Sequence, residues 1–111
     1  MKKLFLTLMF SLIGSLAFSE GLPTLVGSCQ LCLSGEDISF IGYKYINNKE
    51  YLLALHSYLN RGEVHYFPCS VSNGSIFCDV GPFALPGDWL AQAVRMDTGK
   101  VVAQTGFHVT N

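Results

Sequence analysis

The segment Cys69-Ser-Val-Ser-Asn-Gly-Ser-Ile-Phe-Cys78 constrains the fold most, because its two cysteines stand at equal distances from an Asn-Gly pair. Asn73-Gly74 is the strongest short signal for a two-residue β-hairpin turn. Counting outward from that turn places Cys69 opposite Cys78 in a non-hydrogen-bonded pair, with Cα atoms about 4.5 Å apart. A disulfide spans that separation. The segment therefore predicts a β-hairpin closed by a Cys69–Cys78 bond.

The rest of the chain also alternates short apolar segments with turn residues, and no apolar period of 3.6 residues persists beyond two turns. The expected strands are Ile38–Ile46, Tyr51–Leu59, Glu63–Cys69, Ser75–Val80, Asp88–Asp97 and Lys100–Val109, with a further short strand within Thr24–Leu33. Six to seven antiparallel strands predict an all-β fold, a small two-sheet sandwich, with a small barrel as the alternative.

The amino terminus has the pattern of a secretory signal peptide. Met1-Lys2-Lys3 precedes an uncharged run from Leu4 to Phe18 that ends beside small residues. This run is shorter than the roughly 20 residues that a spanning helix needs. We therefore predict a signal peptide at residues 1–19 and one domain at residues 20–111, exported to the periplasm or outside the cell and not inserted in the membrane after cleavage. An uncleaved anchor and lipidation of Cys29 are the alternatives.

The charge of the predicted mature chain excludes two classes of partner. Five basic residues stand against eight acidic ones, which gives a net charge of −3, and no basic run occurs. Phosphate backbones are bound by clustered Lys and Arg. We therefore expect no nucleic-acid partner and no binding to an anionic membrane surface.

Cys29 and Cys32 form a C-x-x-C motif, and all four cysteines lie beyond the predicted signal peptide. An even number of cysteines in a short exported chain indicates disulfides, which persist in oxidising compartments. A redox C-x-x-C motif needs a helix amino terminus that lowers a thiol pKa, and a strand follows here instead. Cys29 and Cys32 either bond to each other or remain free thiols; a periplasmic thiol protein that uses them for redox exchange or metal binding is the alternative function.

No catalytic residue, metal site or cofactor is predicted. No nucleophile has a recognisable base beside it, and the cysteine spacing matches a zinc site poorly. His56 and His65 are expected on opposite sheet faces, and His108 on the outward face of the last strand.

Tyrosines on the expected strands are the candidate binding residues. Tyr43 and Tyr45 are expected to share a face, and exposed aromatic faces bind sugars or proteins. The candidates are Tyr43, Tyr45, Tyr58 and Tyr66. The alternative is that tyrosine simply favours half-buried strands. Trp89 is expected in the core.

The carboxy-terminal half contains short motifs in a fixed order: Ser72-Asn73-Gly74-Ser75-Ile76-Phe77, Leu85-Pro86-Gly87-Asp88-Trp89, Asp97-Thr98-Gly99-Lys100-Val101-Val102-Ala103 and Phe107-His108-Val109. This order resembles the closing strands of bacterial immunoglobulin-like domains. Ile38–Tyr43 followed by Asn47-Asn48 resembles the first core strand and turn of that family. The resemblance covers about residues 36–109 and implies a sandwich with an adhesive or scaffolding role; no catalytic residue carries over. The cysteines depart from the family pattern and imply a stand-alone, disulfide-reinforced domain.

These observations together predict a non-enzymatic, exported immunoglobulin-like module that binds a protein or a glycan.

Overall fold

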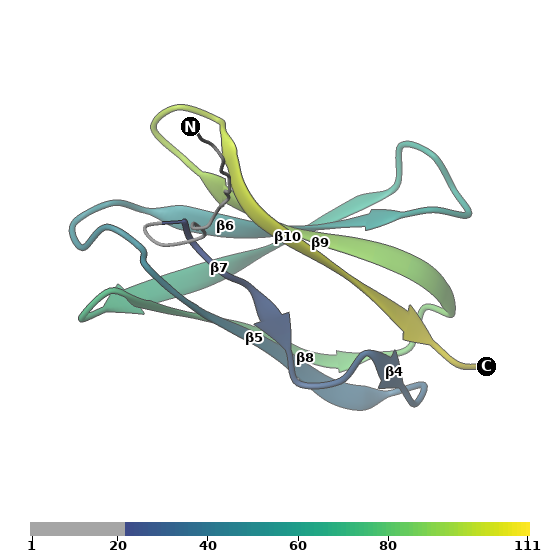
Figure 1. Ribbon diagram of the computed structural model, residues 1–111. Helices are drawn as coiled ribbons and strands as arrows, with labels where there is room; N and C mark the ends of the chain where they lie inside the picture. Colours follow the sequence, from purple (N-terminus) through teal and green to yellow (C-terminus); the bar gives the residue numbers. More distant parts are fainter. Residues whose placement is uncertain (1–21) are drawn as a thin grey trace, which may run out of the picture.

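The computed structural model describes residues 22–111, and every regular element in them is a β-strand (Figure 1). The predicted all-β class is therefore confirmed, together with reinforcement by two disulfides. Within these residues no helix is long and apolar enough to cross a membrane. The predicted signal peptide lies outside the described residues.

Residues 22–111 contain eight strands, one more than the upper limit predicted. They are β3 (Val26–Gly27), β4 (Leu31–Cys32), β5 (Glu36–Tyr43), β6 (Tyr51–Ser57), β7 (Val64–Ser72), β8 (Ser75–Phe83), β9 (Gly87–Arg95) and β10 (Val101–Val109). The additional strand arises because the first predicted segment divides into two. β3 pairs with β5, whereas β4 pairs in parallel with β10, so the strands are not all antiparallel.

The strands form one curled, hydrogen-bonded sheet in the order β3-β5-β8-β7-β6-β9-β10-β4, not two separate sheets. The nine-residue strand β7 is the reason, since its first half pairs with β6 and its second half with β8. The curl brings β5 and β8 opposite β9 and β10 (Figure 1). The region between them is the core.

The predicted hairpin is present in the predicted register. Asn73 and Gly74 both have positive φ, at 53° and 78°, as the tight hairpin turn requires. Cys69 pairs directly with Cys78 and is bonded to it, with Cα atoms 4.3 Å apart. Cys78 is fully buried. The hairpin bond therefore joins β7 to β8 at the edge of the core.

Cys29 and Cys32 are also bonded to each other, across a Cα separation of 5.4 Å. This bond closes the short turn between β3, which pairs with β5, and β4, which pairs with β10. On one side of the turn Ser28 N donates to Ser39 O at 2.8 Å, and on the other His108 N donates to Gln30 O at 2.8 Å. The local bond, one of the two predicted states of this motif, is the one observed.

Aromatic side chains from both halves of the curled sheet meet in the core. The ring of Phe40 on β5 lies 5.6 Å from that of Phe107 on β10, and Phe83 on β8 lies 5.0 Å from Trp89 on β9. Trp89 is buried, as predicted, and its indole N–H donates to Leu85 O at 3.0 Å. The interior is thus close-packed and leaves no polar indole group unsatisfied.

Gly42 is required by the close approach of the amino-terminal segment to β5. A Cβ at this position would lie 1.9 Å from Thr24 O, so the segment would have to move. We expect Gly42→Ala to lower the free energy of unfolding by about 1–3 kcal/mol, as overpacking does. Urea unfolding measures the change.

Gly106→Ala is the matched control, because its Cβ would meet only Trp89 O, at 3.7 Å. We expect a change within about 0.5 kcal/mol for this variant. Equal losses for the two variants would contradict the proposed role of Gly42.

Candidate functional site

The four candidate tyrosines do not form one site. Tyr43, Tyr58 and Tyr66 are exposed, but they lie on three different parts of the surface. Tyr43 ends β5, Tyr58 follows β6 and lines a hollow beside β9 and β10, and Tyr66 lies on β7. Tyr45 is only 4% exposed. The three exposed tyrosines therefore belong to separate surfaces.

The expectation that Tyr43 and Tyr45 share an exposed face is wrong. Lys44 has a positive φ of 74°, which ends β5 at Tyr43 and breaks the strand alternation. The Tyr45 hydroxyl consequently turns inward and donates to Thr24 O at 2.7 Å. Its ring packs edge-on against Tyr51, with centroids 5.1 Å apart. Tyr45 is a core residue that anchors the amino-terminal segment.

Burial of Tyr45, with a further contribution from Tyr51, raises the pKa of its hydroxyl from 10.0 to about 12. The unfolded chain then ionises before the folded one, so stability is complete below pH 10 and is lost as pH rises towards about 12. We expect the difference in unfolding free energy between wild type and Tyr45→Phe to shrink across this window. Urea unfolding of both proteins, repeated at intervals of roughly one pH unit from about pH 8 to 12, measures this difference. A difference that is constant with pH would contradict the burial of the hydroxyl.

An apolar surface, here called the β5–β8 face, crosses the outer side of three strands. Val26 on β3 is paired with Ile41 on β5, which is paired with Phe77 on β8. These three side chains are 55%, 45% and 48% exposed, and Tyr43 follows Ile41 on the same face of β5 at 59%. Serines border a shallow hollow of about 250 Å³ beside them, namely Ser70, Ser72 and Ser75.

Ile41 and Phe77 were not among the predicted binding residues, although the hairpin register contained the signal for Phe77. Adjacent strand residues point to opposite faces. Because Cys78 is buried, Phe77 must point outward. Ile41 follows in the same way from the buried Phe40 beside it.

A second concave surface lies where β9 begins and β10 ends. This hollow, about 500 Å³ in volume, is here called the Gly106 hollow and is lined by Gln30, Tyr58, Asp88, Trp89, Gly106, Phe107 and His108. His108 faces Asp88 across the strand pair, and its Nδ1 lies 2.7 Å from Asp88 Oδ1. The outward position of His108 implied a side chain in contact with solvent alone, but its imidazole is paired with the Asp88 carboxylate. None of the lining residues is a serine, threonine, cysteine or lysine nucleophile.

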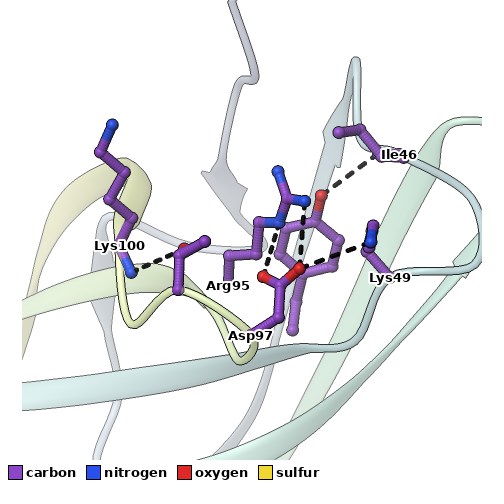
Figure 2. A network of polar contacts seen from close by, with 7 residues as sticks. Ile46, Lys49, Arg95, Asp97 and Lys100 are labelled. Atoms are coloured by element: carbon purple, nitrogen blue, oxygen red, sulfur yellow. Dashed lines mark hydrogen bonds and ion pairs between the residues drawn. The ribbon is translucent and has the colours of Figure 1, made fainter.

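A polar network ties together the connections at the opposite end of the sheet (Figure 2). Arg95 donates two hydrogen bonds to the Asp97 carboxylate, at 2.7 and 3.1 Å, and Lys49 lies 3.5 Å from it. The bonds from Arg95 hold the pKa of Asp97 below its usual range. In the same region Ile46 N donates to the Tyr51 hydroxyl. These contacts fix the β5–β6 connection against the β9–β10 turn, and we assign them a structural role.

His65 belongs to the fold. His65 Nε2 lies 2.8 Å from Glu63 Oε2, and this hydrogen bond lowers the pKa of Glu63. The His65 ring also packs near Trp89, at 5.7 Å. Across residues 22–111 no three His, Cys, Asp or Glu side chains gather in a group that could hold a metal ion.

The disulfides leave the thiol alternative without geometric support. Cys32 is fully buried and Cys29 partly buried, and the turn that contains them leads from one strand to another. No helix in the described part of the chain supplies an amino terminus to lower a thiol pKa. Two disulfides are compatible with an oxidising, exported location.

No protein-family model matches the chain, and no curated protein matches it either. The function is therefore inferred from the two surfaces described above.

Proposed function

We propose that this chain is an exported immunoglobulin-like domain that binds a protein partner through the β5–β8 face and performs no catalysis. The observation that carries the proposal is the row of exposed apolar side chains formed by Val26, Ile41 and Phe77, extended by Tyr43.

The strand order supports the immunoglobulin-like assignment. The constant-type immunoglobulin fold has strands A, B, E and D in one sheet and C, F and G in the other. Labelling β3, β5, β8 and β7 as A, B, E and D, and β6, β9 and β10 as C, F and G, gives the same neighbours. Four departures remain. The strands labelled D and C pair with each other, so the two sheets are joined into one, and the additional strand β4 pairs in parallel with the strand labelled G. The hairpin disulfide joins neighbouring strands, and Trp89 lies on the strand labelled F, not on C.

The chemistry of the β5–β8 face favours protein over glycan. Val26, Ile41 and Phe77 carry no hydrogen-bonding groups, whereas a sugar presents hydroxyls that need partners. Contiguous exposed apolar side chains with a polar border are typical of protein interaction surfaces. The serines around the hollow provide such a border.

Export and the absence of catalysis are supported separately. The predicted signal peptide and the two disulfides both favour an oxidising compartment. The described residues that line the Gly106 hollow include a His–Asp pair but no serine, threonine, cysteine or lysine for that pair to activate.

Site-specific photocrosslinking tests the proposal. Benzoylphenylalanine replaces Phe77 in one variant and Gln104, an exposed residue of β10 away from this face, in the control. In the cells that make the protein, we expect a discrete protein adduct from position 77 and none from position 104. Excess wild-type domain should suppress the adduct, whereas Phe77→Asp should not. No adduct at position 77, or equal adducts at both positions, would contradict the proposal.

A further inference from the structure

We propose that the Gly106 hollow is a second binding site, which takes a neutral oligosaccharide. This site is separate from the β5–β8 face and does not depend on the function proposed for that face. Its elements come from distant parts of the chain: Gln30 precedes β4, Tyr58 follows β6, Asp88 lies on β9, and Gly106 and His108 lie on β10.

The hollow exists because Gly106 has no side chain. Gly106 is paired with Leu90 across the β9–β10 ladder, and the next outward residue along β10 is His108. A Cβ on Gly106 would touch only Trp89 O, at 3.7 Å, so the backbone has room for a larger residue. The missing side chain thus leaves an open space beside the Asp88–His108 pair.

The backbone fixes the polar groups around this space. Tyr58 N donates to Asp88 O at 3.0 Å, and His108 N donates to Gln30 O at 2.8 Å. Asp88 Oδ1 holds the imidazole of His108 at Nδ1, at 2.7 Å, while Asp88 Oδ2 and His108 Nε2 take part in no hydrogen bond within the described residues. The Asp88–His108 side-chain pair and the backbones that carry Gln30 and Tyr58 are therefore positioned before any ligand binds.

The lining residues match the chemistry of a sugar. A pyranose ring has an apolar C–H face and a rim of hydroxyls that both donate and accept hydrogen bonds. Tyr58, 62% exposed, offers an aromatic ring, and Gln30, Asp88 and His108 offer an amide, a carboxylate and an imidazole. Among the described residues neither lysine nor arginine lines the hollow, and the carboxylate of Asp88 repels anions. An anionic ligand is therefore disfavoured, and the sugar hydroxyls that these groups can bind make a neutral sugar the ligand we propose.

Titration with defined oligosaccharides tests the inference. Cellotetraose, mannotetraose and chitotetraose are added separately to the 15N-labelled domain, and the amides of Gly106 and the Gln30 side chain are followed by NMR. We expect at least one of the three to shift these signals in a saturable way. A sulfated heparin tetrasaccharide should leave them in place.

Three variants locate the binding. Gly106→Val fills the hollow and should abolish binding, while the melting temperature remains close to that of wild type because the position tolerates a Cβ. Tyr58→Ala should weaken binding by at least about tenfold, which is the effect of losing one good contact. Tyr66→Ala is the matched control, since it removes an equally exposed tyrosine outside the hollow and should leave affinity unchanged.

Three results would overturn the inference: saturation by none of the neutral oligosaccharides, binding only of the sulfated one, or full affinity in Gly106→Val. A protein crosslinked to position 58 in the cell, with no response to any oligosaccharide, would assign the hollow to a protein contact instead. The Phe77 crosslinking experiment is unaffected by any of these results, so the two proposals fail separately.

Discussion

Replacing Trp89 with alanine is expected to lower the free energy of unfolding by about 3–5 kcal/mol, the range for removing a large aromatic side chain from a core. Trp89 is 2% exposed and packs against the rings of Phe83 and His65, at 5.0 and 5.7 Å. Its truncation leaves a cavity where β8 and β9 meet. A domain of this size has about 5–15 kcal/mol of total stability, so the variant is expected to be partly unfolded near 37 °C.

Guanidinium unfolding followed by circular dichroism measures the loss. Trp89→Phe is the milder variant, because it keeps one aromatic ring in the core and loses the second ring together with the N–H that donates to Leu85 O. We expect a smaller loss for Trp89→Phe than for Trp89→Ala. Met96→Ala, at an exposed position, serves as the neutral control. A loss below about 1 kcal/mol for Trp89→Ala would show that the core is not packed as described.

Removal of the hairpin disulfide by Cys69→Ala and Cys78→Ala is expected to cost about 2.5–3 kcal/mol. The bond closes a loop with a sequence separation of 9, and cross-links over longer loops restrict the unfolded chain more. The Cys29–Cys32 bond, with a separation of 3, should contribute about 2 kcal/mol by the same relation. Removing the longer link is therefore expected to destabilise the domain more.

Chemical denaturation of the two double variants and of wild type, with and without reductant, tests this order. Reductant should destabilise wild type and leave a variant without either bond unchanged. A larger loss from removing Cys29–Cys32 would mean that the turn between β3 and β4 matters more to the native state than the hairpin link does.

The parts of the fold that were predicted well depend on local chemistry. Asn73-Gly74 sets the hairpin turn, and the turn sets the register that brings Cys69 opposite Cys78. The six main strands follow from their apolar and aromatic composition, with ends that differ by a few residues. Signals of this kind lie within ten residues of one another, so the sequence alone displays them.

The parts that were missed depend on long-range contacts. Nothing near Lys44 indicates that this residue adopts a positive φ and turns Tyr45 into the core. The conformation is stabilised by a hydrogen bond from Tyr45 N to Gly74 O, and Gly74 lies much farther along the chain. The amino-terminal segment pairs with β5 before Cys29 and with β10 after it, and both of these partners lie farther along the sequence. The continuous sheet results from the length of β7, which pairs with both neighbours.

The candidate surfaces show the same division. Phe77 follows from the hairpin alternation, once Cys78 is assigned to the core. The Gly106 hollow could not be predicted in this way, because Gln30, Tyr58 and Asp88 are brought together only by the β4–β10 and β6–β9 pairings. Tyr58 was a predicted binding residue, and its neighbours there were not.

Intact mass spectrometry of the protein recovered from the cells that make it tests most directly whether this is an exported domain held by structural disulfides. The protein is alkylated either before or after reduction. We expect a chain that begins at Glu20, carries no alkyl group before reduction and carries four after it, one on each cysteine. A chain that keeps residues 1–19 would contradict export by a cleaved signal, and a mass that begins at Cys29 with an acyl group would indicate a lipoprotein. Thiols at Cys29 and Cys32 that alkylate without reduction would contradict the structural role of that bond and favour the thiol function.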